Sequence, residues 1–184
     1  LALEHTLLAQ SHVIPKALVG KTMPDLTLAS LDDGQPVRLR DSLRQGPVLV
    51  NFFASWCAPC RLEQPALLSL KAQGVQVIGV NYEDVPPRGS PQAAQTFLAR
   101  LGDPYAHRVV DPDGRAGIEF GLTGVPETYL VAPDGKILAM RADSISKVGS
   151  NCVSVSPLGK VRGPRSGSYD IPLVCLVARA MFAN

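Results

Sequence analysis

The sequence predicts an α/β fold with a mixed central sheet and helices on both faces. Two apolar runs, 48–53 and 75–80, are typical of central strands that are covered on both faces. The helix-like stretch 61–72 lies between them, and a strand, a helix and a strand in this order form a right-handed βαβ unit with parallel strands. Turn signals of the Asp-Gly type at 32–34 and 133–135 indicate antiparallel hairpins on either side of that unit.

The residues before the first apolar run divide into a lead-in and a hairpin. Residues 1–17 are the lead-in, where Pro15 breaks any helix. The short strands 27–31 and 37–39 flank the first turn signal, and together they predict an N-terminal β-hairpin.

The first helix, at 61–72, has an apolar stripe and a defined end. Four residues at helical spacing are expected to face the core: Leu62, Ala66, Leu67 and Leu70. Pro65 lies inside the helix and is expected to kink it. Gly74 is placed to end the helix, since glycine is favoured just beyond a helix C-terminus.

A second helix is expected to begin after Ser90, because serine is a good N-cap and Pro91 suits the first helical position. Gly102 ends it, after a stripe formed by Ala94, Phe97, Leu98 and Leu101. With the strand 107–110 this helix forms a central αβ insertion. A short helix at 116–120 and hairpin strands at 128–131 and 137–140 complete the predicted elements.

Charge and composition exclude several classes of function. Residues 1–140 carry 12 Lys/Arg and 14 Asp/Glu, whereas residues 141–184 carry 6 and 2, so the formal charge of +2 comes from the tail. A nucleic-acid-binding protein is expected to carry a basic face on a folded domain, so nucleic-acid binding is not predicted. No apolar run approaches the roughly 18 residues that a membrane span needs.

The most informative motif is Trp56-Cys57-Ala58-Pro59-Cys60, which follows an apolar strand and precedes a helix. This arrangement puts the first sulfur at a helix N-terminus, where unpaired N–H groups favour the thiolate over the thiol. The spacing also lets the two cysteines close into a disulfide. The motif therefore predicts dithiol–disulfide exchange, with Cys57 as the exposed attacking thiolate and Cys60 as the shielded resolving thiol.

Two other uses of a Cys-x-x-Cys pair fit the sequence poorly. A structural zinc site needs about four ligands, and the chain has no second pair and only scattered histidines. Covalent haem attachment requires histidine after the second cysteine, where this chain has Arg61. No metal, nucleotide or other cofactor is expected. Cys152 and Cys175 are read as incidental residues of the tail.

These residues resemble the DsbE/CcmG group of thiol:disulfide interchange proteins of cytochrome c biogenesis, within the TlpA-like thioredoxin family. The resemblance covers about residues 18–140. Four segments carry it: 18–21 with Pro24, 50–61, 81–82 with Asp84, and 124–129. It implies a thioredoxin-like fold and a protein-disulfide oxidoreductase.

The resemblance assigns roles around the cysteine pair. Pro126 is expected to be cis and to lie beside the cysteines, so that the backbone of Val125 can pair with a client strand. Glu127 is expected near the active site, where it tunes the thiols or takes protons; the alternative is a solvated carboxylate at a strand end. Trp56 is expected to flank the pair and shape the client groove, with Pro59 as a supporting residue between the cysteines.

Thioredoxins have a buried aspartate at the strand position that Asn51 occupies here. Since asparagine does not titrate, another acid or water must transfer the proton. The candidates are Glu63, Glu83, Asp84 and Glu127. Each has a plainer alternative: Glu63 supports the first helical turn, and Glu83 and Asp84 are loop charges.

The resemblance implies a periplasmic or extracytoplasmic dithiol reductant that acts on apocytochrome c or a haem-lyase subunit and is recharged by a membrane thiol reductant. Two alternatives stay open: a general TlpA-like reductase with other clients, and a non-catalytic binding module. An N-terminal tether to the inner membrane, absent from this chain, would fit the lead-in as a remnant after a signal or anchor.

The chain is expected to have three parts. Residues 1–17 form the lead-in, 18–142 the thioredoxin-like domain and 143–184 an atypical tail. The resemblance stops after Ala139, and the tail lacks the final amphipathic helix that is usual in the family. It is either a divergent C-terminus or the product of a shifted reading frame or another artefact.

Overall fold

The computed structural model of the chain describes residues 18–142, 144 and 145. The predicted lead-in, Cys152 and Cys175, and the tail apart from residues 144 and 145 lie outside the described residues.

Within the described residues, one mixed sheet has seven strands in the order β2-β1-β5-β4-β3-β6-β7. The strands are β1 (Thr27–Ser30), β2 (Pro36–Arg38), β3 (Val48–Phe53), β4 (Gln76–Tyr82), β5 (His107–Asp111), β6 (Glu127–Val131) and β7 (Ile137–Arg141). The central pairs β3–β4 and β4–β5 are parallel, and the other pairs are antiparallel. The mixed sheet and both hairpins are thus confirmed.

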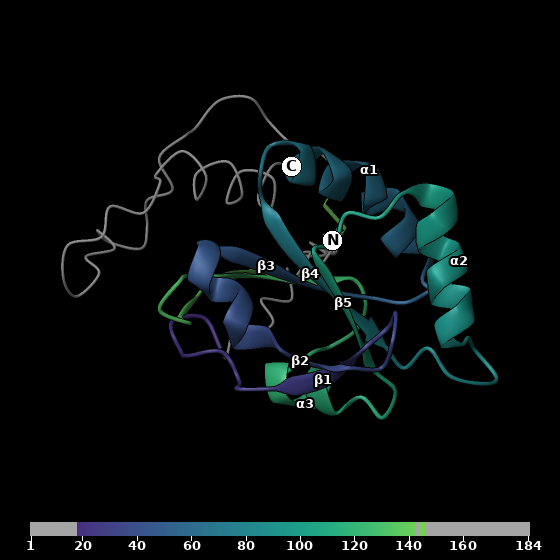
Figure 1. Cartoon of the computed structure of the whole chain (residues 1–184), viewed down its shortest axis with the longest axis horizontal. Helices are drawn as coiled ribbons and strands as arrows, with labels where there is room; N and C mark the ends of the chain where they lie inside the picture. Colours follow the sequence, from purple (N-terminus) through teal and green to yellow (C-terminus); the bar gives the residue numbers. More distant parts are fainter. Residues whose placement is uncertain (1–17, 143, 146–184) are drawn as a thin grey trace, which may run out of the picture.

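Helices cover both faces of the sheet, as predicted. Helices α1 (Ala58–Ala72) and α2 (Pro91–Leu101) lie on one face, which we call the α1 face (Figure 1). The short helix α3 (Arg115–Phe120) and the 3-10 helix η1 (Leu39–Gln45) pack against the opposite face, which we call the α3 face.

Side-chain alternation along β3 divides the core into two clusters. Leu49 and Phe53 belong to the cluster under α1 and α2, whereas Val50 and Phe52 belong to the cluster under α3. Successive residues of a strand point to opposite faces, so Asn51 points to the α1 face, where it is fully buried. One polar side chain is therefore enclosed in the core beneath α1.

Helix α1 differs from the prediction at its start and in its buried face. It begins at Ala58 rather than residue 61, because Cys57 is the N-cap and Pro59 is tolerated in the first turn. The inward placement of Leu62 was wrong: Leu62 is 73% exposed, and Glu63 faces the interior instead. The assigned helix continues through Pro65.

Leu101, the last residue of the stripe predicted for α2, is 38% exposed, whereas Ala94, Phe97 and Leu98 are buried. Gly74 has a φ of +84° and donates its N–H to Lys71 O, so it ends α1 as predicted. Ser90 caps α2 by accepting the Ala93 N–H. Helix η1 was not predicted: the expected strand ended at Leu39, but Leu39 begins η1 and is fully buried. Strand β1 also pairs with β5, which attaches the hairpin to the sheet.

Among the helices of the described residues, none is both long enough and apolar enough to cross a membrane.

Candidate active site

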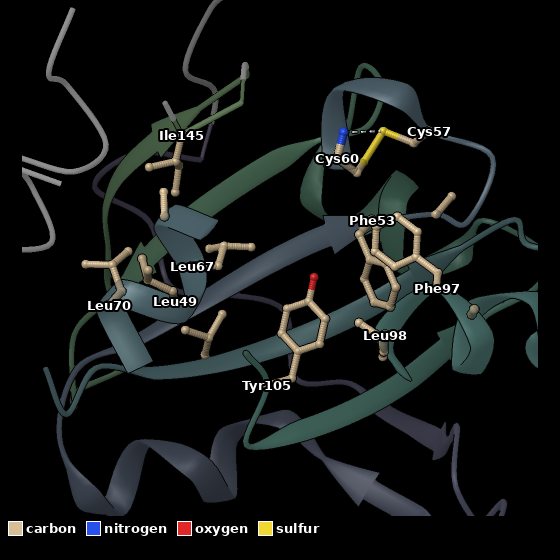
Figure 2. Packing of buried hydrophobic residues seen from close by; sticks show 14 of the residues in the cluster. Leu49, Phe53, Cys57, Cys60, Leu67, Leu70, Phe97, Leu98, Tyr105 and Ile145 are labelled. Atoms are coloured by element: carbon tan, nitrogen blue, oxygen red, sulfur yellow. Dashed lines mark hydrogen bonds between the residues drawn. A yellow bond between two sulfur atoms is a disulfide. The ribbon is translucent and has the colours of Figure 1, made fainter. Parts of the chain in front are cut away.

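The two cysteines lie where β3 passes into α1. Cys57 and Cys60 form a disulfide, with their Cα atoms 5.3 Å apart. The Cys60 N–H at the helix N-terminus donates to Cys57 Sγ over 3.1 Å (Figure 2). A backbone donor and the positive end of the helix dipole both point at this sulfur, which favours a thiolate at Cys57 in the reduced protein.

The expected exposure of Cys57 was wrong for this oxidised form. Cys57 is 3% exposed and Cys60 is 1% exposed, and both belong to the cluster under α1 and α2. Trp56 and Val125 pack against the same cluster as partly buried residues. The disulfide is therefore covered by its own neighbours, and exposure does not distinguish the attacking sulfur from the resolving one.

The loop before β6 contacts the disulfide. The Val125–Pro126 peptide bond is cis, and the carbonyl oxygen of Val125 lies 3.5 Å from Cys57 Sγ. The predicted cis conformation and the predicted place beside the cysteines are both confirmed. Proline has no N–H, so the polar backbone group nearest Cys57 on this side is the Val125 carbonyl, an acceptor for a client N–H.

Trp56 is held from the side by the loop that follows β4. Its Nε1–H donates to Glu83 O over 3.3 Å, and the Arg88 guanidinium lies 4.4 Å from the ring centroid. Arg88 also forms an ion pair with Glu83 at 2.7 Å. A cation over a tryptophan face is attractive, so this loop fixes the ring beside the cysteines. Pro59, by contrast, is exposed in the first turn of α1.

Asn51 is the centre of a buried hydrogen-bond network under α1. Its Nδ2 donates to Glu63 Oε1 over 2.9 Å and to Thr128 Oγ1 over 3.0 Å. Its Oδ1 accepts the Tyr105 hydroxyl proton over 2.7 Å. Both amide groups are thus satisfied, and the asparagine joins β3, α1, β6 and the loop before β5. Asn51, which does not titrate, therefore orients the carboxyl group of Glu63, which does.

Glu63 is the acid of this network and lies one helical turn after Cys60. Both residues are 1% exposed and face the sheet, since residues three apart share a helix face. Burial raises the pKa of Glu63 from 4.5 to about 7, against the lowering effects of Asn51, of the Ile145 N–H and of the positive charge on Arg141. The alternative that Glu63 only supports the first helical turn does not explain a buried carboxyl in this network.

Asp84 is also more than a loop charge, because it is 2% exposed and fully bonded. Its carboxylate accepts the Ser55 N–H at 2.6 Å, the Ser55 hydroxyl at 2.7 Å and the Asn81 amide at 2.8 Å. A Cβ on Gly89 would lie 1.7 Å from Asp84 Oδ1, so glycine is required there. Asp84 therefore ties the end of β4 to the segment that precedes Trp56.

Glu127 follows the cis-proline but faces the other side of the sheet. It is 1% exposed, so the alternative of a solvated carboxylate is wrong. Its Oε1 accepts the Thr123 N–H at 3.0 Å and the Thr123 hydroxyl, and its Oε2 accepts the Tyr129 hydroxyl at 2.7 Å. Tyr129 belongs to the cluster on the α3 face.

Sequence reasoning missed Tyr105, Thr128 and Ile145. Tyr105 is fully enclosed, and burial raises its pKa well above 10.0. Nothing in its neighbourhood along the chain indicated a contact with Asn51, which is 54 residues away. The polar residue Asn51 in an otherwise apolar strand was the available signal, because a buried amide requires partners from elsewhere.

Comparisons with known proteins agree with this geometry. A family model described as Redoxin matches residues 18–150. The thiol:disulfide interchange protein HelX of Rhodobacter capsulatus is 42% identical over 137 residues, covering 74% of each chain. The thiol:disulfide interchange protein DsbE of Escherichia coli is 40% identical over 134 residues, covering 72% of this chain and 70% of DsbE.

A solved structure extends the comparison to the fold. The thioredoxin domain of a thiol-disulfide oxidoreductase from Bacteroides vulgatus superposes with a TM-score of 0.56 at 26% identity. The match covers 68% of this chain and 89% of that domain.

Proposed function

The chain belongs to the Redoxin family, as a thioredoxin-like thiol–disulfide oxidoreductase similar to DsbE and HelX, and from this premise we propose that it is a dithiol reductant of cytochrome c maturation. The observation that carries the proposal is the Cys57–Cys60 pair, placed between the start of α1 and the cis-Pro126 loop.

In the first step, the reduced protein meets a disulfide in its client. The Cys57 thiolate, stabilised by the Cys60 N–H, attacks one client sulfur. A mixed disulfide forms, and the other client sulfur leaves as a thiolate that takes a proton from water. The Val125 carbonyl accepts an N–H from the client backbone and holds the client chain across the cysteines.

In the second step, Cys60 resolves the mixed disulfide. Its thiol passes a proton to Glu63, and the resulting Cys60 thiolate attacks Cys57 Sγ. The Cys57–Cys60 disulfide forms, and the second client sulfur leaves as a thiolate that takes a proton from water. A carboxyl whose pKa is about 7 can accept and release this proton near neutral pH. The exchange uses only the two sulfurs and a proton acceptor, without a cofactor.

The client, the compartment and the electron source are proposed from the likeness to DsbE and HelX. The client is the disulfide of apocytochrome c or of a haem-lyase subunit. The compartment is periplasmic or extracytoplasmic, because a protein disulfide persists as a substrate only where conditions are oxidising. A membrane thiol reductant recharges the cysteine pair.

Trapping tests the function and the order of attack together. Cys60→Ser should accumulate mixed disulfides through Cys57, because the resolving thiol is gone, and mass spectrometry of the trapped partner identifies the client. Cys57→Ser is the matched control and should trap little. Equal trapping by both variants would show that the assigned order is wrong.

Identification of the partner separates the proposal from a general TlpA-like reductase. Partners unrelated to cytochrome c maturation would favour the general reductase, whereas no partner from either variant would favour a binding module. The direction of electron flow is tested by the reduction potential of the pair. A value near the roughly −120 mV of a strong oxidant would contradict a reductant.

A further inference from the structure

We propose that Ile145 is a positioning residue for Glu63: its backbone N–H orients the carboxyl group, and its side chain keeps water away from it. This inference rests on the proposed use of Glu63 as the proton acceptor for Cys60. It adds a residue from beyond β7 to a site that otherwise comes from β3, α1, β6 and the loop before β5.

The contact itself is direct. The Ile145 N–H donates to Glu63 Oε2 over 3.2 Å, while Asn51 donates to the other oxygen, Oε1, over 2.9 Å. Each oxygen of the carboxyl group therefore has its own donor, one from β3 and one from the segment that follows β7. Two donors on two oxygens fix the rotation of the carboxyl plane relative to α1.

The side chain of Ile145 closes the space around this contact. Ile145 is fully buried and belongs to the same cluster as Leu49, Leu67 and Leu70 (Figure 2). In Figure 2 it lies toward these leucines, whereas the disulfide lies at the other end of the drawn cluster. Leu67 is four residues after Glu63 and so shares its face of α1. Removing the isoleucine side chain would open a route for water along this face.

The other charged and titratable groups around Glu63 act in known directions. The positive charge of Arg141, from β7, lowers the pKa of Glu63. Tyr105 is linked to Glu63 by Asn51, which accepts the Tyr105 hydroxyl proton. The negative charge of Glu63 contributes to the raised pKa of Tyr105. Desolvation is the largest effect and raises the pKa of Glu63 to about 7. Burial of Glu63 therefore affects its pKa more than the charges of its neighbours do.

The backbone N–H and the side chain of Ile145 place different demands on the residue type at this position. Any residue except proline supplies a backbone N–H, but only a sizeable apolar side chain excludes water. Residue 145 lies just beyond β7, within residues 18–150 that the Redoxin model matches.

The test uses the full chain in its oxidised form, in which Cys57 and Cys60 are joined and do not titrate. The pKa of Glu63 is measured by NMR from the pH dependence of its side-chain carboxyl carbon. Ile145→Ala should lower the pKa by about one unit, a tenfold change in the ratio of ionised to neutral carboxyl at a fixed pH, because water enters. Ile145→Pro should raise it instead, because the N–H that favours the charged form is lost.

Two further variants are the controls. Ile145→Val keeps most of the apolar volume and should retain the wild-type pKa, and Ser144→Ala changes the neighbouring residue only. An unchanged pKa in a folded Ile145→Ala protein, or an equal fall in Ser144→Ala, would overturn the inference. If Ile145→Pro does not fold, the pKa of Glu63 in Ile145→Ala compared with that in Ile145→Val is sufficient to test the inference.

A second readout separates this inference from the proposed function. The pH profile of mixed-disulfide resolution in the reduced protein should move with the pKa of Glu63 in each variant. A pKa that moves while the profile stays fixed would support the positioning role and refute Glu63 as the proton acceptor. A pKa that stays fixed would refute the positioning role whatever the exchange rate does.

Discussion

Replacing Glu63 by glutamine should remove a large part of the pH dependence of folding stability in the oxidised protein. The pKa of Glu63 is about 7 in the folded protein and is expected near 4.5 in the unfolded chain. Between these values the folded protein binds the proton that the unfolded chain has released. Stability therefore falls as pH rises from about 4.5 to about 7 and is constant with respect to this group above that range.

The size of the effect follows from the difference between the two pKa values. At about 1.4 kcal/mol per pKa unit, the change from 4.5 to about 7 costs the folded state about 3 kcal/mol at high pH. Because part of this loss has already occurred at pH 5, the free energy of unfolding should fall by about 2.5 kcal/mol between pH 5 and pH 8 through Glu63 alone. A group 1% exposed is little screened by solvent.

Glutamine also has a cost that does not depend on pH. Asn51 and the Ile145 N–H both donate to Glu63, but the glutamine side chain offers a single acceptor oxygen. One donor then faces the amide NH₂ group, at a cost of about 1–3 kcal/mol. The absolute stability of the variant is therefore a poor measure, and the informative quantity is the difference between wild type and variant at two pH values.

Urea denaturation of both oxidised proteins at pH 5 and pH 8 measures this quantity. We expect the wild type to lose about 2.5 kcal/mol more than Glu63→Gln over this interval. Glu119→Gln, at an exposed position on α3, should follow the wild type within about 0.5 kcal/mol. Parallel curves for wild type and Glu63→Gln would refute the argument that burial raises the pKa of this acid.

Two further predictions concern the supports of the site. Asp84→Ala should lower the free energy of unfolding by about 3 kcal/mol in urea denaturation, because three donors lose a buried carboxylate. Glu119→Ala, at an exposed position, should cost less than about 0.5 kcal/mol. A similar loss in both variants would show that Asp84 is only a loop charge. Gly79→Ala should cost about 1–3 kcal/mol in the same assay, since its Cβ would lie 2.6 Å from a buried tyrosine ring, and Gly124→Ala, with nothing within 4 Å, is the control whose equal loss would contradict this account.

The order of helices and strands could be predicted because the strongest signals along this chain are local. The apolar runs of β3 and β4, the cap at Ser90 and the glycine after α1 each determine structure within a few residues. Prediction failed where two local patterns competed. Leu62 fits an apolar stripe, but Glu63 takes the inward position because Asn51 offers it a partner across the core.

The parts of the site that depend on short sequence motifs were predicted, whereas the contacts between distant segments were not. The cysteine pair and the cis-proline follow from short motifs, and their contact is found as expected. The identity of the acid was left open among four residues, because burial and partners decide it. The partner residues come from three other segments of the chain, and no pattern in a single segment reveals their distances.

The buried carboxyl groups of Glu63 and Glu127 lie on opposite faces of the sheet, and we infer that this separates their roles. Thr128 accepts a hydrogen bond from Asn51 on the α1 face, so its neighbour Glu127 must point to the α3 face, since successive residues of a strand alternate. There the oxygens of Glu127 accept hydrogen bonds from Thr123, in the loop that carries the cis-proline, and from Tyr129, in β6. Glu127 therefore braces the cis-proline loop from the α3 face, whereas Glu63 lies on the α1 face with the cysteines and is the acid that we propose for proton transfer.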